Sequence, residues 1–74
     1  MKESNDNLIK LGNNIRNIRL NKKMSIEDLS FEAEMSRNYI SDVERGKRNI
    51  SFINLTKLAK ALEVNIKQLF DSIE

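Results

Sequence analysis

The sequence predicts an all-α fold, a compact five-helix bundle, from three observations. The 74 residues contain no proline and only two glycines. Apolar residues recur at the three- and four-residue spacing of one helix face. A serine or asparagine stands before each of the later apolar runs, where the N-cap of a helix is expected. A chain of this length forms one domain, which we expect over residues 8–74 after a flexible N-terminal segment at residues 1–7.

The first helix is expected over about residues 8–22. Its apolar residues fall on one face, and they are Leu8, Leu11, Ile15 and Ile18, with Leu20 close to the same face. Gly12 lies inside this helix, where glycine costs about 1 kcal/mol relative to alanine. We therefore expect a close contact with another helix at Gly12.

The second and third helices are short and closely spaced. Ser25 precedes a helix over about residues 26–33, and Asp28 three residues on predicts a capping box. Ser36 opens the third helix, which is expected to turn Tyr39, Ile40 and Val43 inward and to end near Arg45 and Gly46. Glycine is the residue most often found just past a helix end.

The last two helices are expected after Ser51 and Asn65. The fourth carries Ile53, Leu55, Leu58, Ala59 and Leu62, and the fifth carries Ile66, Leu69, Phe70 and Ile73. Short helices with brief connections pack into one bundle.

Composition excludes several classes of function. The chain has no Cys and no His, which rules out disulfides, Cys/His zinc sites and the Ser–His and Cys–His nucleophile pairs. It has no phosphate-binding glycine loop, and its acids are scattered over helix starts, so we expect no enzyme, no cofactor and no metal. No apolar run approaches the ~20 residues that span a bilayer, and the first residues lack the apolar core of a signal peptide. We expect a soluble, cytoplasmic protein with no membrane partner.

Charge is distributed in blocks along the chain. The formal net charge is only +2, but residues 1–24 sum to +4, residues 25–36 to −4 and residues 37–50 to +2. Ordinary solvated helix faces account for this pattern as well as a nucleic-acid partner does. Charge alone leaves both interpretations open.

The most informative segment is the helix pair over about residues 25–45. Only Glu34 and Met35 separate the second helix from the cap of the third, so the third must cross the second steeply and expose its amino end. That arrangement can place polar side chains in the major groove of DNA. The exposed candidates are Arg37, Asn38, Ser41 and Asp42. An ordinary helical hairpin with a polar outer face is the alternative.

A resemblance to a known family rests on these residues. The segments SIEDLS at 25–30, MSRNYISDVERGKRN at 35–49 and LTKLAKALEV at 55–64 resemble the lambda-repressor-like (Xre/Cro type) helix-turn-helix family. The match extends over about residues 8–72, and its RNYIS stretch looks most like the restriction–modification controller proteins of that family. Antitoxins and phage repressors are also members of this type.

The resemblance implies roles for individual residues. Base-reading positions fall on Arg37, Asn38 and Ser41, and backbone-contacting positions fall on Ser36, Tyr39, Lys47, Arg48 and Asn49. Two cations and an amide on a loop also suit phosphate binding physically, although solvated charge is the simpler alternative for Lys47 and Arg48. The family pairs a first-helix arginine with the glutamate that ends the recognition helix, and here these residues are Arg19 and Glu44.

Three positions depart from the family pattern. Ile26 replaces the usual phosphate-contacting glutamine, Ser30 replaces an alanine, and Glu34 replaces the glycine of the turn. A positive φ at Glu34 would cost about 1 kcal/mol or more. The fold is compatible with all three, but Ile26 leaves more of the DNA contact to other residues.

These features predict a transcriptional regulator that binds a pseudo-palindromic double-stranded DNA operator as a homodimer. One short reading helix contacts few base pairs, and a dimer doubles the contact. The expected dimer interface is formed by Ile66, Leu69, Phe70 and Ile73, although these residues would otherwise close the core. An antitoxin or other protein-interaction module is the alternative function. No small-molecule effector is evident.

Overall fold

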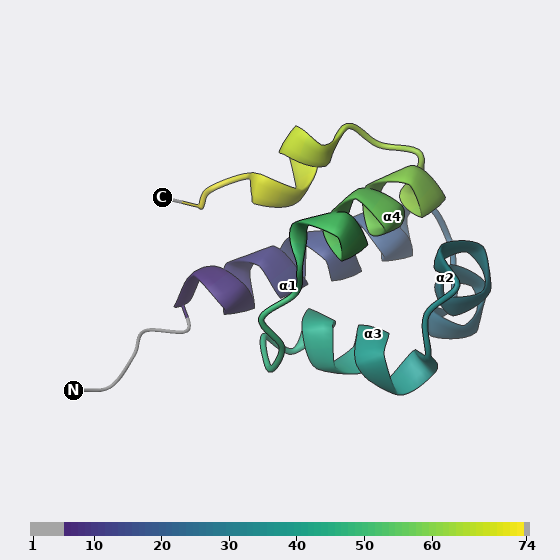
Figure 1. The fold of residues 1–74 in the computed structure, drawn as a ribbon. Helices are drawn as coiled ribbons and strands as arrows, with labels where there is room; N and C mark the ends of the chain where they lie inside the picture. Colours follow the sequence, from purple (N-terminus) through teal and green to yellow (C-terminus); the bar gives the residue numbers. More distant parts are fainter. Residues whose placement is uncertain (1–5, 74) are drawn as a thin grey trace.

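The computed structural model describes residues 6–73, which form four α-helices and one 3₁₀ helix (Figure 1). In chain order these are α1 (Asp6–Asn21), α2 (Ile26–Ala33), α3 (Arg37–Glu44), α4 (Phe52–Leu62) and η1 (Ile66–Phe70). The all-helical prediction is confirmed. The expected fifth α-helix is instead a 3₁₀ helix, because five residues give room for little more than one turn and short runs readily adopt the tighter form.

The observed boundaries and exposures differ from the prediction in three places. Helix α1 begins at Asp6, so the last two residues of the predicted N-terminal segment are helical, while residues 1–5 lie outside the described residues. Leu20 and Ile53, both expected on apolar faces, are 47% and 68% exposed. Each is out of phase with the buried stripe of its helix, which runs through Leu11 and Ile15 in α1 and through Leu55, Leu58 and Leu62 in α4.

Serine side chains begin the three later α-helices, as predicted. The hydroxyls of Ser25, Ser36 and Ser51 accept hydrogen bonds from backbone N–H groups three residues on. At α2 the Asp28 carboxylate also accepts from the Ser25 N–H at 3.0 Å, which completes the predicted capping box. Each cap satisfies backbone donors that the first turn of a helix leaves without partners.

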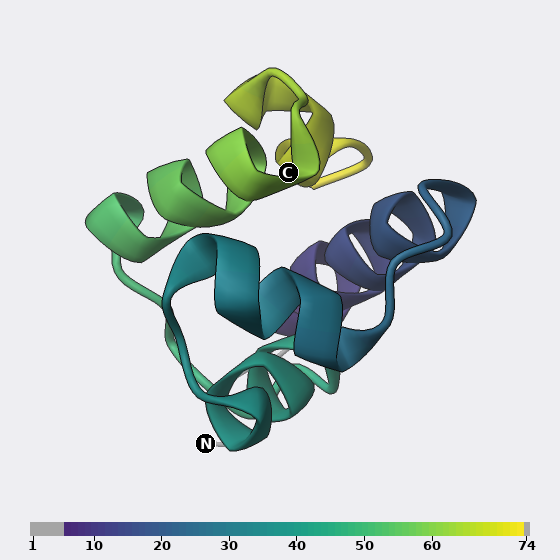
Figure 2. The same cartoon turned by 90° about the vertical axis from the view of Figure 1, so that its right-hand side faces the viewer.

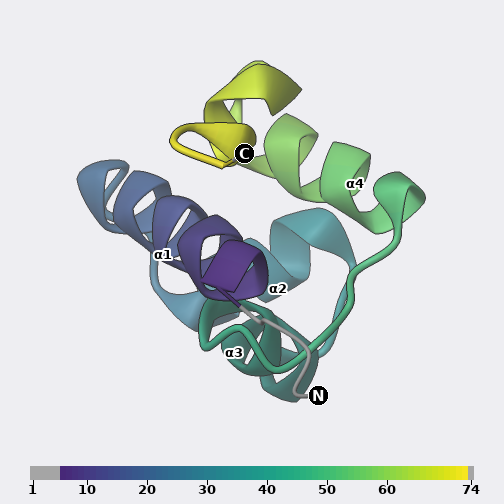
Figure 3. The same ribbon diagram turned by 90° about the vertical axis from the view of Figure 1, so that its left-hand side faces the viewer.

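The helices surround one apolar core. Its fully buried side chains are Ile15, Leu29, Ile40, Val43, Leu58, Leu62 and Leu69. Helix α1 lies between α3 on one side and η1 on the other (Figures 1 and 3), while α2 contacts both α3 and α4. No helix within residues 6–73 is long and apolar enough to cross a membrane.

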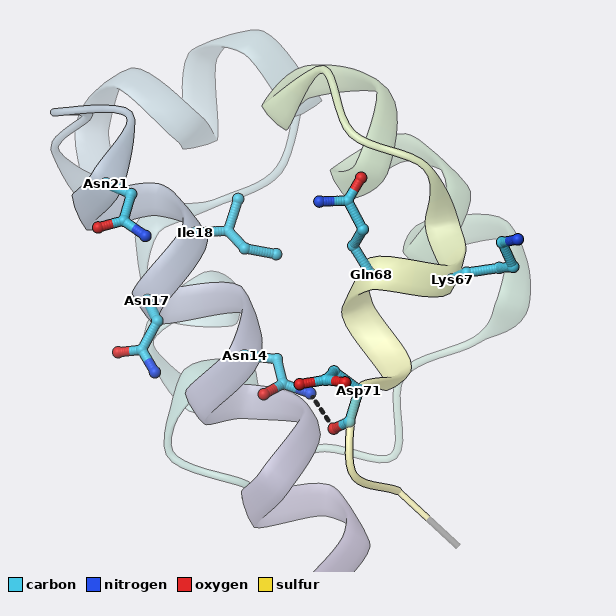
Figure 4. Close-up of a pocket in the computed structure, with 7 residues that line it drawn as sticks. All are labelled: Asn14, Asn17, Ile18, Asn21, Lys67, Gln68 and Asp71. Carbon is cyan, nitrogen blue, oxygen red and sulfur yellow. Dashed lines mark hydrogen bonds between the residues drawn. The ribbon is translucent and has the colours of Figure 1, made fainter.

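Asn14 fixes the C-terminal turn to α1. Its side-chain amide donates to the carbonyl oxygen of Leu69 at 2.9 Å and to that of Asp71 at 2.8 Å (Figure 4). Beside this contact lies an open, amide-lined hollow of about 430 Å³ between α1 and η1. The two bonds satisfy carbonyls at the end of η1 and so hold the last turn of the chain against the first helix.

Both glycines of the chain lie where α1 meets α3. A Cβ atom on Gly12 would collide with the backbone carbonyl oxygens of Val43 and Glu44 in the last turn of α3. Gly46, just past α3, has a φ of +74°, and a Cβ there would lie 2.7 Å from the Ile9 side chain. The close helix contact expected at Gly12 is therefore present, and its partner is the end of α3.

Replacing Gly12 with alanine should destabilise the protein although alanine is the better helix former. The methyl group meets backbone atoms that cannot move without shifting α3, and we expect a loss of about 1–3 kcal/mol in the free energy of unfolding. Urea unfolding measures it. Asn13→Ala, at an exposed position in the same helix, is the control and should leave stability unchanged or slightly raised. Equal stability of the two variants would show that α3 can shift to accommodate the methyl group without a cost in stability.

Candidate nucleic-acid interface

The turn between α2 and α3 sets the direction of α3. Glu34 adopts a left-handed conformation, with φ 58° and ψ 46°, and the Met35 N–H donates to the Ser30 carbonyl at 3.0 Å. Glu34 thus adopts the left-handed conformation that glycine adopts most readily, and for a residue with a Cβ atom this conformation costs about 1–2 kcal/mol. The chain then becomes extended at Ser36 and enters α3. Helix α3 runs across the view in Figure 1, and α2 runs across the view in Figure 2, which is turned by 90° about the vertical axis. The two helices therefore cross steeply.

The two faces of α3 differ in burial. Ile40 and Val43 are buried in the core, whereas Arg37 and Asn38 in the first turn are exposed. Ser41 and Asp42 are half-buried. The amino end of α3 therefore presents a guanidinium and an amide to solvent, and these are the groups whose geometry suits guanine and adenine edges.

A buried ion pair fixes the carboxyl end of α3. Arg19 of α1 donates from Nε to Oε2 of Glu44 at 2.7 Å and from a terminal nitrogen to Oε1 at 3.0 Å. Another guanidinium nitrogen donates to the Met24 carbonyl at 2.9 Å. Only 8% of the Arg19 side chain and 4% of the Glu44 side chain are exposed. The hydrogen bond to Glu44 raises the pKa of Arg19 above its ordinary value, so the buried guanidinium keeps its positive charge.

Arg37 is paired with α2. Its Nε lies 3.0 Å from Oε2 of Glu27, and both side chains are more than half exposed. Exposed pairs of this kind contribute less than about 1 kcal/mol. Arg37 can therefore exchange Glu27 for another acceptor at little cost.

A cluster of five side chains lies along the other exposed flank of α3. The Tyr39 hydroxyl accepts from the amide of Asn54 in α4 at 3.0 Å, and the Arg48 guanidinium lies 4.9 Å from the centre of the Tyr39 ring. Asp42 pairs with Arg48 at 3.7 Å and with Arg45 at 3.2 Å. Sequence reasoning missed the part played by Asn54, whose only signal is its place three residues after the Ser51 cap. It counted Asp42 as exposed without predicting its partners.

The predicted DNA-contacting residues all lie on α3, at its cap or in the loop that follows. They are Ser36, Arg37, Asn38, Tyr39, Ser41, Lys47, Arg48 and Asn49. The Ser36 hydroxyl accepts from the Tyr39 N–H at 3.0 Å, and the Lys47 N–H donates to the Asp42 carbonyl at 2.8 Å. These bonds order the two ends of the set while the side chains of residues 47–49 remain exposed.

The predicted dimer interface needs one correction. Leu69 is fully buried in the core of its own chain, so it offers no surface to a second copy. Its side chain belongs to the core where η1 packs against α1 and α4. For Leu69 the alternative expectation, that the residue closes the core, therefore holds. Ile66 and Ile73 are half-buried, and Phe70 is 37% exposed. More exposed apolar side chains lie elsewhere, at Phe31, Phe52 and Ile53.

Comparison with known proteins gives consistent matches. A helix-turn-helix family model matches residues 15–69. The control protein C.BamHI of Bacillus amyloliquefaciens is 52% identical over 61 residues, which cover 81% of this chain and 75% of that protein. The crystal structure of the restriction-modification controller protein C.AhdI from Aeromonas hydrophila superposes with a TM-score of 0.86 at 42% identity, covering 88% of this chain and 98% of that one. A structure of the C.Esp1396I controller protein, a tetramer in complex with its natural 35-base-pair operator, gives a TM-score of 0.79 at 37% identity and covers 90% and 97% of the two chains.

Removing one member of the Arg19–Glu44 pair should strongly destabilise the fold. Arg19→Ala leaves the Glu44 carboxylate buried without its partner, and we expect a loss of about 3–5 kcal/mol in the free energy of unfolding. The double variant Arg19→Met/Glu44→Leu should lose much less, because no charge is then stranded. Arg16→Ala, an exposed arginine of α1, is the control and should change stability by less than about 0.5 kcal/mol. Additive losses in the double variant would show that the two residues act independently.

Proposed function

The chain belongs to the helix-turn-helix family, and from this premise we propose that it is a sequence-specific regulator of transcription that binds double-stranded DNA. Its relatives are regulators, and it is not an enzyme. The observation that carries the proposal is the geometry of α3, whose exposed first turn carries Arg37 and Asn38 while its last turn is fixed to α1 by the Arg19–Glu44 pair. A reading helix must be held rigidly if its side chains are to discriminate between bases.

Base reading is assigned to Arg37, Asn38 and Ser41. An arginine can donate two hydrogen bonds to guanine, and an asparagine can exchange two with adenine, in the major groove. The weak pair between Arg37 and Glu27 orients the guanidinium without holding it firmly. Ser41, one turn further along and half-buried, has a shorter reach and completes the set.

Backbone contact is assigned to Ser36, Tyr39, Lys47, Arg48 and Asn49. Phosphate contacts position a protein on the duplex without specifying its sequence. Lys47 and Arg48 supply the two cations, on a loop that leaves α3 through Gly46. Ser36 and Asn49 add neutral polar groups at either end of the set. Because Ile26 cannot donate to a phosphate, this loop carries more of the backbone contact than it would in a family member with glutamine there.

We further propose that the protein binds a pseudo-palindromic operator as a homodimer of the controller-protein type. One α3 helix reads few base pairs, and two related by a twofold axis read half-sites about 34 Å apart. The apolar surface for a second copy is assigned to Phe70 with Ile66 and Ile73, now without Leu69. The operator-bound tetramer of C.Esp1396I supports assembly on DNA. Since the proposed partner is DNA, we place the action of the protein in the cytoplasm.

Selection of bound sequences from a pool of random duplexes tests the proposal directly. We expect enrichment of a two-part site with twofold symmetry and a spacing of about one helical turn. An unenriched pool, with binding that depends only on salt, would contradict sequence-specific recognition. The selected duplex then serves as the specific operator in the experiments below.

Arg37→Ala and Arg48→Ala remove one positive charge each but should have different effects. Arg37→Ala should cost about 1–3 kcal/mol on the selected operator and relax the preference at one base pair per half-site. Arg48→Ala should weaken binding to all duplexes alike and reduce the salt dependence by about one unit of slope per subunit. Affinities for operator and random duplexes at several salt concentrations separate the two. A changed base preference in Arg48→Ala but not in Arg37→Ala would reverse the assignment.

Phe70→Ser should weaken the homodimer without unfolding the chain, because the ring is partly exposed and contributes little to the core. We expect sedimentation equilibrium at micromolar concentrations to show a dimer for the wild type and a shift toward monomer for the variant. Phe52→Ser, at a more exposed ring in α4, is the matched control and should leave the dimer intact. A monomer in Phe52→Ser and a dimer in Phe70→Ser would place the interface at the start of α4 instead.

A further inference from the structure

Asp42 is an acid in the middle of the surface assigned to DNA. It lies on α3 one turn beyond Asn38, and its side chain is one-third exposed. Each of its carboxylate oxygens meets a different arginine: Oδ1 lies 3.2 Å from a terminal nitrogen of Arg45, and Oδ2 lies 3.7 Å from Nε of Arg48. One carboxylate thus offsets half the charge of the two arginines that flank it.

Arg48 is held from two sides. The Asp42 carboxylate lies at its Nε, and the Tyr39 ring lies beneath its guanidinium at 4.9 Å. The ring is itself fixed, because its hydroxyl accepts a hydrogen bond from Asn54. The cation assigned to phosphate binding therefore rests against its own helix when no DNA is present. Release from Tyr39 alone would not free Arg48 to turn outward, because Asp42 would still hold it.

The strength of these pairs suits an exchange. Arg45 and Arg48 are 61% and 51% exposed, so each pair with Asp42 contributes only about 0.2–1 kcal/mol. A phosphate can replace the carboxylate as the partner of an arginine, but the carboxylate then remains near the phosphates and repels them. An operator and a random duplex have the same phosphates, so this repulsion lowers affinity for both, and the base contacts of the operator are additional.

We propose that Asp42 lowers the sequence-independent affinity for DNA: its carboxylate holds Arg45 and Arg48 and repels phosphate, and so weakens binding to duplexes of any sequence. The proposal rests on the function proposed above and deepens it. Asp42 touches no base in this scheme. It lowers affinity for random duplexes and for the operator by the same factor, because both present the same phosphates.

The test compares Asp42→Asn, which keeps the shape and removes the charge, with Glu63→Gln. Glu63 is exposed at the end of α4 and lines a hollow with Lys22 and Glu32, not with residues of α3. This control therefore removes the same charge away from the surface assigned to DNA. Both variants should melt near the wild-type temperature. Asp42→Asn should bind random duplexes about two- to fivefold more tightly per subunit than the control does, the factor given by release of an exposed ion pair. Its salt dependence on random DNA should be steeper by about one unit of slope per subunit.

Affinity for the operator should rise by the same factor, so the ratio of operator to random affinity should stay unchanged in both variants. If Arg48 is the released cation, Asp42→Asn should raise affinity for random duplexes much less when it is added to Arg48→Ala than when it is made in the wild-type protein. Equal affinities of Asp42→Asn and Glu63→Gln for random duplexes would overturn the proposal. Weaker binding of Asp42→Asn to the operator without a gain on random duplexes would overturn it as well. A wild-type protein with no operator preference at all would instead contradict the proposed function itself.

Discussion

The contact between α1 and the last turn of α3 is the constraint on which the arrangement of the other elements depends. It has two components, the close backbone approach at Gly12 and the buried pair of Arg19 with Glu44. The first allows the helices to meet at short range, and the second satisfies a charge that could not otherwise be buried. Within residues 6–73 no buried side-chain nitrogen or oxygen lacks a partner. With its carboxyl end fixed in this way, α3 can leave its amino end in solvent without losing its orientation.

Most of the fold could be predicted from the residues because local signals were strong. The Ser caps, the apolar periodicity of α1 and α4 and the glycine after α3 each have a direct structural counterpart. The failures lie where local signals are weak. A run of five residues cannot show whether it will form an α or a 3₁₀ turn, nor which of its apolar side chains faces the core. Leu69, expected at an interface, is therefore buried instead. Ile53 is a different case: it lies in the first turn of α4, outside the apolar stripe of that helix, and is exposed.

The candidate site shows a similar division. The resemblance placed the polar residues on α3 and its loop, and it paired Arg19 with Glu44, because these positions depend on spacing along the chain. It could not reveal that Glu27 lies beside Arg37, or that Asn54 reaches Tyr39. Those contacts depend on how α2 and α4 cross the ends of α3, a tertiary relation that spacing does not encode. Three of the acids that offset the basic residues in the formal net charge of +2, Glu27, Asp42 and Glu44, pair with arginines of this region.

The position of Tyr39 has an optical consequence. The chain has one tyrosine and no tryptophan, so its near-ultraviolet emission arises almost entirely from a single phenol. The phenol lies at the junction of α3, the Arg48 loop and the first turn of α4, so its emission reports on that junction. Intensity and lifetime therefore monitor events at this junction alone, without an attached dye or an introduced chromophore.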